Sequence, residues 1–404
     1  MRRLLWLLLA VNCLAVPCAC GLGRTAVLDS TTASAAPAVS VPFDLIDNRI
    51  VIDVKLDGKG PFRFIFDTGA VSVVSMELAR AEGLRVEGLS RGSGGVGEST
   101  VERGQTNISD TAVGSVHLKD EDYGVLSFAD NKYVFGANRI DGIIGYPLFK
   151  RFVVTVDYER RLLTFTEPGQ FTYKGPGTVV PIDFDRHLPL VKGELDDIPG
   201  VFVIDTGARS ALLLYGPFVE QHRLREKYRA SIEGITGWGI GGPVRSQIVR
   251  TLKLKLGAVE VTNLVARLSL QRSSSLTSSD HAALVGPDVL KQFTTIFDYS
   301  RRQIIFEKNA EYGKPDSYDR AGMWFGLEGD HFEVIDVMAG GPAAEAGLKV
   351  GDHILTIDGQ SVTTLDLPSA RLRFKNDPVK ERIRLTIEHG GQRREVVLTL
   401  RDLV

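Results

Sequence analysis

The sequence is very poor in cysteine. Its three cysteines, Cys13, Cys18 and Cys20, all lie near the N-terminus of the 404-residue chain. A cysteine nucleophile, a cysteine-ligated zinc ion and an internal disulfide are therefore excluded from the rest of the chain. The seven histidines are scattered and show neither His-x-x-x-His nor His-Glu-x-x-His spacing, so we expect no metal and no cofactor.

The chain also lacks an excess of either charge. It has 48 Lys+Arg against 50 Asp+Glu, a net charge of −2, which argues against a nucleic-acid-binding protein. Beyond the first residues, no apolar run is long enough for a transmembrane helix. The 42 glycines are spread along the chain, a pattern typical of many short strands joined by tight turns.

The N-terminus has the pattern of a leader. Arg2 and Arg3 precede an apolar run at residues 4–16, which is too short to cross a bilayer as a helix. We therefore interpret residues 1–21 as a signal peptide and expect an exported protein, periplasmic or secreted. The alternative is a lipoprotein, anchored by a lipid on Cys18 or Cys20. Residues 22–40 are rich in Ala, Ser and Thr and predict a flexible spacer.

An internal repeat determines the predicted fold. Four segments recur in the same order at offsets of 138 to 141 residues: 41–44 with 180–183, 64–70 with 202–208, 142–145 with 283–286, and 156–161 with 297–302. The chain therefore holds two copies of one unit of about 140 residues, the usual size of a domain. We assign lobe 1 to residues 41–168 and lobe 2 to residues 169–308.

Each copy has mainly strand-like patterns. Residues 49–56 come close to strand alternation, and apolar runs at 152–156 and 162–165 flank a turn, which predicts a hairpin. Short helices are expected at 75–82 and 287–292.

In each copy an apolar strand ends in Asp-Thr-Gly, at Asp67-Thr68-Gly69 and at Asp205-Thr206-Gly207, and an apolar-apolar-Gly step follows further on. Over residues 41–308 the sequence resembles a bacterial single-chain, two-lobed aspartic peptidase of the retropepsin-like and pepsin-like superfamily. The resemblance implies a mainly β, two-lobed acid-protease fold with pseudo-two-fold symmetry. It also implies an endopeptidase acting on polypeptides, with Asp67 and Asp205 as the catalytic dyad.

The chemistry of such a dyad follows from its charges. Two carboxyl groups a few ångströms apart cannot both ionise, so they share one proton and can activate a water molecule. Gly69 and Gly207 allow the backbone to approach the carboxyl groups closely. The resemblance assigns cross-lobe hydrogen bonds to Thr68 and Thr206, and it places the apolar-apolar-Gly segments behind the two turns.

The residues after each Asp-Thr-Gly depart from the pattern of many pepsin-like members, which have Ser or Thr there. This chain has Ala70 and Ala208. Loss of a donor to the ionised form raises a carboxyl pKa, so we expect activity at mildly acidic to neutral pH. Arg209 would act in the opposite direction if it pointed at the dyad, and the sequence leaves its direction open.

Two glycine-rich segments, 92–97 and 234–242, follow the dyad aspartates at similar distances. The resemblance suggests flaps that close over the substrate, with Gly94, Gly95, Trp238 and Gly239 as candidate contacts. The alternative is that both are ordinary surface loops.

Beyond a polar linker at 309–317, residues 318–404 resemble a PDZ domain, a small α+β fold. The resemblance rests on Gly-Pro-Ala at 341–343, Ala-Gly-Leu at 346–348 and the Gly-Asp and Ile-Asp-Gly turns that follow. It implies binding of C-terminal peptide tails, with Trp324, Phe325, Gly326 and Leu327 as the carboxylate loop. We expect a groove helix at 365–374 and a closing hairpin at 383–389 and 394–400.

The leading interpretation is an exported aspartic endopeptidase with a peptide-binding PDZ module. One alternative is a catalytically inactive scaffold that binds peptides through the PDZ domain. Another is a processing peptidase that cleaves only when the right tail occupies the PDZ domain.

Overall fold

The computed structural model describes residues 38–93 and 95–404. The predicted signal peptide, Cys18 and Cys20, residues 22–37 of the predicted spacer, and Gly94 lie outside these residues. The predicted fold class is confirmed: the chain is mainly β, with a PDZ domain at its C-terminus. The first strand begins at Val39, so the last two residues of the predicted spacer lie in a sheet.

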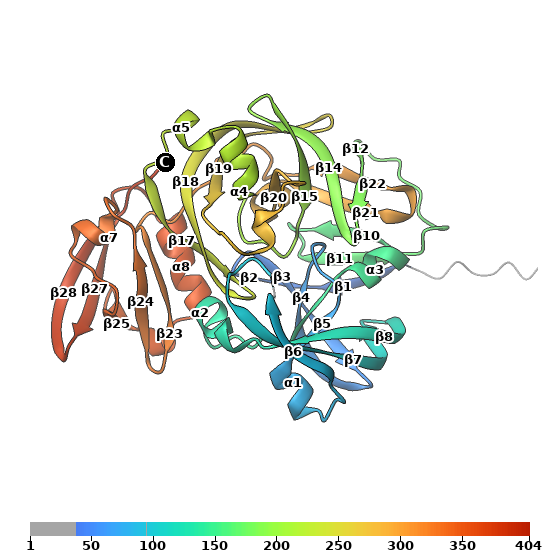
Figure 1. Cartoon of the computed structure of the whole chain (residues 1–404), viewed down its shortest axis with the longest axis horizontal. Helices are drawn as coiled ribbons and strands as arrows, with labels where there is room; N and C mark the ends of the chain where they lie inside the picture. Colours follow the sequence, from blue (N-terminus) through green and yellow to red (C-terminus); the bar gives the residue numbers. More distant parts are fainter. Residues whose placement is uncertain (1–37, 94) are drawn as a thin grey trace, which may run out of the picture. The chain divides into compact units, whose positions relative to one another are not determined.

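A six-stranded sheet joins the two lobes and takes three strands from each (Figure 1). In spatial order its strands are β1 (Val39–Pro42), β11 (Leu162–Thr166), β10 (Val153–Asp157), β21 (Phe293–Asp298), β22 (Gln303–Lys308) and β12 (Thr178–Pro181). The lobes meet where β10 pairs antiparallel with β21, Val154 opposite Phe297. The hairpin predicted from 152–156 and 162–165 is confirmed as β10 and β11.

Each lobe adds an eight-stranded sheet. In lobe 1 the order is β2 (Asp44–Ile46), β3 (Arg49–Leu56), β4 (Lys59–Phe66), β9 (Gly142–Ile144), β5 (Val73–Ser75), β8 (Val116–Leu126), β7 (Thr100–Val113) and β6 (Glu87–Ser93). In lobe 2 it is β13 (Asp183–Asp185), β14 (Leu188–Leu195), β15 (Ile198–Ile204), β20 (Ala283–Val285), β16 (Leu212–Leu214), β19 (Val259–Ser269), β18 (Gly242–Leu256) and β17 (Ile232–Gly239). Equivalent strands hold equivalent places, so the repeat in the sequence is also a repeat in topology.

Short helices connect these strands. Lobe 1 has α1 (Met76–Ala81), the 3-10 turn η1 (Ala129–Asn131), α2 (Lys132–Phe135) and α3 (Tyr146–Arg151); lobe 2 has α4 (Gly216–Gln221), α5 (Leu224–Lys227), η2 (Ser275–Thr277), α6 (Pro287–Leu290) and η3 (Tyr299–Arg301). The helices predicted at 75–82 and 287–292 are confirmed as α1 and α6. Ser75 begins α1 by accepting a hydrogen bond from the Leu78 N–H, a stabilising N-cap.

The core beneath the two Asp-Thr-Gly turns is continuous between the lobes. Phe66 and Phe202, on the strands that enter the turns, are fully buried. The Phe149 ring lies 4.7 Å from that of Phe66 in its own lobe and 5.2 Å from that of Phe297 in lobe 2. Because aromatic packing of this kind tolerates little displacement, it holds the two turns at a fixed separation.

The C-terminal domain has a hydrophobic core of its own. Its sheet has the order β23 (Met323–Glu328), β24 (His331–Val337), β25 (His353–Ile357), β27 (Arg382–His389) and β28 (Gln392–Thr399), and β26 (Gln360–Ser361) pairs with β25. Its helices are α7 (Pro342–Glu345), η4 (Val362–Thr364) and α8 (Leu367–Asn376). The predicted groove helix and closing hairpin are confirmed as α8 and as β27 with β28.

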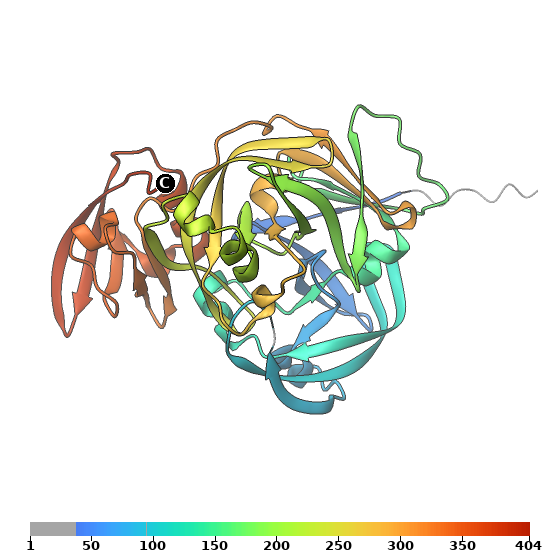
Figure 2. The ribbon, with the colours of Figure 1, turned by 45° about the horizontal axis from the view of Figure 1, so that its top comes forward.

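In Figures 1 and 2 these strands, coloured orange to red, form a group next to β17 of lobe 2. Strand β23 is at the edge of its sheet, which is the position where a PDZ domain adds a peptide strand. Within the described part of the chain, no helix is both long and apolar enough to cross a membrane.

Candidate active site

Each Asp-Thr-Gly turn is anchored to a strand that runs behind it. The Asp67 N–H donates to the Ile144 carbonyl at 3.0 Å, and the Asp205 N–H donates to the Val285 carbonyl at 2.9 Å. Behind the first turn, a Cβ atom on Gly145 would lie only 2.0 Å from the Asp67 carbonyl oxygen. The apolar-apolar-Gly step therefore needs its glycine, because any side chain there would displace the turn.

The two turns are locked together by reciprocal threonine hydrogen bonds. Thr68 Oγ1 donates to the Ile204 carbonyl at 2.7 Å and accepts the Thr206 N–H at 3.0 Å. Thr206 Oγ1 donates to the Phe66 carbonyl at 2.9 Å and accepts the Thr68 N–H at 3.0 Å. Both threonines are fully buried, so these four bonds are shielded from competing water. Thr68 and Thr206 thus lie where the resemblance assigns them.

The carboxyl groups of Asp67 and Asp205 meet and are hydrogen-bonded to each other. A Cβ atom on Gly207 would lie 2.2 Å from Asp67 Oδ2, so glycine is required for this approach. Asp67 Oδ1 accepts the Gly69 N–H at 2.7 Å. Asp205 Oδ1 accepts two backbone donors, the Gly207 N–H at 2.8 Å and the Ala208 N–H at 3.0 Å.

This environment raises the pKa of the pair. Burial raises the pKa of Asp67 well above its ordinary value, and the neighbouring Asp205 carboxylate raises it further. Burial also raises the pKa of Asp205, while its hydrogen bonds from Asp67 and from the Gly207 and Ala208 N–H groups oppose the shift. Asp205 accepts two backbone N–H groups and Asp67 accepts one, so the ionised form of Asp205 is the better stabilised of the two. The pair is therefore set to hold one proton between them.

Two side chains that the sequence did not suggest support the turns from outside. Arg49 Nε donates to the Gly207 carbonyl at 2.9 Å, and its charge lowers the pKa of both dyad aspartates. In the equivalent hairpin of lobe 2, the half-buried His187 makes a hydrogen bond to the Gly69 backbone. Both residues come from a hairpin just upstream of an Asp-Thr-Gly strand, and this shared position in the repeat was the available signal.

Arg209 does not point at the dyad. It binds Asp47, with Nη2 and Oδ1 2.8 Å apart. The cation that acts on the dyad is Arg49 instead, which also pairs with Asp47 at 2.5 Å.

The two glycine-rich segments, one from each lobe, contact each other. The Gly97 N–H donates to the Ile240 carbonyl at 3.0 Å, and the Gly95 carbonyl accepts the Ser275 N–H at 3.1 Å. A Cβ atom on Gly239 would lie 2.4 Å from Val96 Cγ2. These contacts describe a closed arrangement in which each tip reaches the opposite lobe.

Apolar side chains of the two glycine-rich segments are part of this closed arrangement. Val96, from lobe 1, packs against the buried cluster of lobe 2 that contains Val203 and Leu284. Trp238, from lobe 2, packs against the cluster of lobe 1 that contains Ile65. The Trp238 ring is also 4.9 Å from that of Tyr133. The two glycine-rich segments therefore cover apolar surface next to both Asp-Thr-Gly turns.

The predicted PDZ loop lies against lobe 1. Trp324 and Phe325 are buried, with 4% and 0% exposure, and a Cβ atom on Gly326 would touch the Tyr133 ring at 2.7 Å. From α8, Arg371 donates to the carbonyl of Tyr133 at 2.6 Å. Leu327, also on β23, is half-buried against the domain core. Helix α2 of the peptidase lobe thus covers the edge at which a peptide tail would add.

Comparison with known families agrees with this architecture. A family model for aspartyl protease matches residues 52–148, which include Asp67, and a PDZ domain model matches residues 333–388. The chain thus combines an aspartyl protease domain with a C-terminal PDZ domain. Asp205 lies outside the matched range, and its place rests on the repeat and on the shared strand order. Among curated proteins, none matches the chain.

Proposed function

We propose that this protein is an exported aspartic endopeptidase that hydrolyses peptide bonds with a water molecule activated by Asp67 and Asp205. The observation that carries the proposal is the meeting of two half-buried carboxyl groups, one from each lobe, held by the reciprocal hydrogen bonds of the buried Thr68 and Thr206. Export is proposed from the leader pattern of residues 1–21 alone.

The mechanism follows from one shared proton. The ionised carboxyl takes a proton from a water molecule placed between the two groups, and the water oxygen attacks the carbon of the scissile amide. The protonated carboxyl donates to the carbonyl oxygen, which gives a neutral tetrahedral intermediate. The carboxyl that took the water proton then donates it to the amide nitrogen and the carbon–nitrogen bond breaks. The other carboxylate takes a proton from one hydroxyl of the intermediate, so the pair again holds one proton. Because the pKa of the pair is raised, it retains its shared proton at mildly acidic pH.

The closed flaps and the covered β23 edge favour a regulated processing peptidase over one that cleaves any unfolded chain. Helix α2 is held on the PDZ domain by the Arg371 bonds and by the Lys132–Glu328 ion pair at 2.5 Å. The ring of Tyr133, in α2, packs against that of Trp238 in the flap at a tilt of 36°. A tail that adds to β23 has to displace α2, and this loosens the packing of the flap.

The test of catalysis compares the mature wild-type chain with Asp67→Asn and Asp205→Asn on a fluorescent unfolded protein between pH 4 and 7. We expect cleavage by the wild type and loss of at least about 10³-fold in each variant, as for removal of a central catalytic group. Equal turnover in all three proteins, or none in the wild type either with or without a peptide tail that binds the PDZ domain, would leave only the peptide-binding scaffold.

The test of regulation uses Tyr133→Ala, which removes the ring between Gly326 and Trp238, with Tyr133→Phe as the matched control that keeps it. We expect Tyr133→Ala to cleave the unfolded protein faster than the wild type, and Tyr133→Phe to match the wild type. If both variants cleave at the wild-type rate while the Asp67→Asn variant is inactive, the peptidase stands and the regulation by α2 is wrong.

A further inference from the structure

A cavity of about 80 Å³ lies where lobe 1, lobe 2 and the PDZ domain meet, and neither Asp67 nor Asp205 lines it. Lobe 1 contributes the β2–β3 hairpin, lobe 2 contributes β19 and the residues after α6, and the PDZ domain contributes the start of β23 and helix α8. The residues that matter for its charge are Asp47, Arg209, Arg267, Lys291, Asp319, Arg371 and Lys375.

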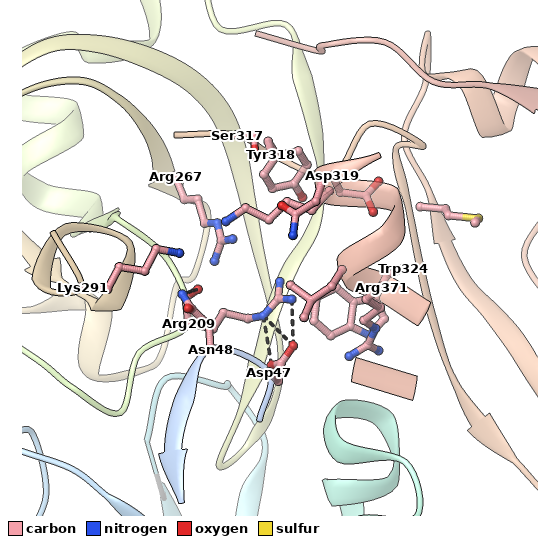
Figure 3. Close-up of a pocket in the computed structure, with 14 residues that line it drawn as sticks. Asp47, Asn48, Arg209, Arg267, Lys291, Ser317, Tyr318, Asp319, Trp324 and Arg371 are labelled. Carbon is pink, nitrogen blue, oxygen red and sulfur yellow. Dashed lines mark hydrogen bonds and ion pairs between the residues drawn. The ribbon is translucent and has the colours of Figure 1, made fainter. Parts of the chain in front are cut away.

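The lining carries more positive than negative charge. Five cationic side chains line the cavity against two carboxylates, Asp47 and Asp319. Figure 3 shows the nitrogen ends of Arg209, Arg267 and Lys291 directed toward the same space. Burial raises the pKa of Asp319 to about 6, which weakens its contribution of negative charge still further.

Some of these cations already have acidic partners. Arg209 binds Asp47, as described above. Lys291 and Lys375 share Asp288, at 2.5 Å and 2.9 Å, and this carboxylate lies behind them, outside the cavity lining. Three of the five cations therefore have an acidic partner, and the two carboxylates that serve them are each shared with a second cation.

Arg267 and Arg371 have no carboxylate within ion-pair distance among residues 38–93 and 95–404. Arg371 instead donates to backbone carbonyls and lies 4.1 Å from the Trp324 ring centroid. Arg267 is 7% exposed, and its Nε has no hydrogen-bond partner; its nearest aromatic contact is Tyr318, at 5.6 Å. Burial, together with the charge of Arg209, lowers the pKa of Arg267 to about 10.

A buried guanidinium without a counter-charge is costly, since the loss of its hydration amounts to several kcal/mol. An oxyanion in the cavity would offset this cost, because carboxylate and phosphate oxygens match the fork of the guanidinium donors. A water-sized site needs roughly 10–15 Å³, so the cavity has room for a group of about the size of phosphate or a carboxylate.

We propose that this cavity binds a small oxyanion, a carboxylate or a phosphate, through Arg267 with Lys291 and Arg209. The site does not require peptidase activity and stands independently of the proposed function. The oxyanion has two possible sources. One is a free anion, and the other is the C-terminal carboxylate of a peptide added to β23, since Met323 and Trp324 at the start of that strand line the cavity.

The experiment measures the melting temperature of the whole mature chain in inorganic phosphate and in sodium chloride at equal ionic strength. We expect stabilisation by phosphate above that by chloride. Arg267→Met should melt at a higher temperature than the wild type without phosphate, because it removes an unpaired buried charge. It should also bind phosphate about tenfold or more weakly in calorimetry. Arg85→Met, at a side chain that is 88% exposed, is the control and should behave as the wild type.

A second variant, Lys291→Met, should also weaken phosphate binding. It keeps the proposal testable if Arg267→Met does not fold. Competition with one hydrophobic peptide, carrying either a free C-terminal carboxylate or an amide, identifies the source. Displacement of phosphate by the free acid alone indicates a peptide carboxylate, and no displacement by either form indicates a free anion. Phosphate stabilisation no greater than that by chloride, or equal phosphate affinity in the wild type and both variants, would overturn the proposal.

Discussion

Replacing Thr68 by Val tests how the two lobes hold the dyad. Valine has nearly the shape of threonine, so the substitution removes the hydroxyl and leaves the packing. The Ile204 carbonyl and the Thr206 N–H then lose their partners at 2.7 Å and 3.0 Å in a fully buried site. Each buried, unsatisfied backbone group costs about 1–3 kcal/mol, so we expect a loss of about 2–6 kcal/mol in the free energy of unfolding.

This loss is large against the total stability of a typical domain, about 5–15 kcal/mol. Urea unfolding followed by circular dichroism measures it, and cleavage of the unfolded protein measures the accompanying loss of activity. Thr68→Ser keeps the hydroxyl and removes one methyl group, and it should cost only about 1 kcal/mol. Thr251→Val removes a single hydrogen bond, to Leu264 within one hairpin, and should leave activity unchanged.

The reasoning is refuted if Thr68→Val unfolds within about 0.5 kcal/mol of the wild type, which is the range of ordinary surface substitutions. It is also refuted if Thr68→Ser is as destabilising as Thr68→Val, because the hydroxyl would then not be the group that matters.

Three further predictions concern the dyad and the flaps. The raised pKa of Asp67 means that the folded state keeps a proton that the unfolded chain releases, so wild-type stability falls as pH rises from the ordinary Asp value toward the raised one. Asp67→Asn should therefore melt above the wild type at pH 7 and lose this advantage below about pH 3.9; an advantage that grows with acid would contradict the pKa shift. Arg49→Met removes a charge that lowers the pKa of both dyad aspartates, so the pH profile of kcat/KM should move to higher pH, and a shift to lower pH would count against it. In Gly97→Ala the new Cβ would lie 2.1 Å from the Gly241 carbonyl carbon, which should separate the two flaps, and trypsin should then cut them faster. Gly237→Ala, where a Cβ meets nothing within 4 Å, is the control. Equal cleavage rates in the two variants would argue against contact between the flaps in solution.

The sequence was most informative where backbone geometry depends on particular residues. The Asp-Thr-Gly turns and the glycine after each apolar step sit where almost no other residue fits, as the 2.0 Å approach at Gly145 illustrates. The offset of the repeat predicted two equivalent lobes, and the matching strand order bears this out. Such local patterns therefore predict both the fold and the residues that its turns require.

Contacts between segments far apart in the chain could not be predicted in this way. The bond from Arg49 to the Gly207 carbonyl joins residues 158 positions apart, and the bond from Arg371 to the Tyr133 carbonyl joins residues 238 positions apart. A single arginine in a strand or helix carries no sign of its partner. The covering of β23 by α2 depends on how the domains pack, and neither local pattern nor composition determines that packing.

The central claim, that one carboxyl from each lobe meets its equivalent and shares a proton, is tested most directly by carbon-13 NMR of the mature chain labelled at the aspartate carboxyl carbons. Comparison with Asp67→Asn and Asp205→Asn assigns the two signals. We predict that the pair titrates in two coupled steps, one of them well above the ordinary Asp pKa of about 3.9, and that either substitution changes the titration of the remaining carboxyl. Two independent titrations near the ordinary value, each unaffected by the other substitution, would contradict the account.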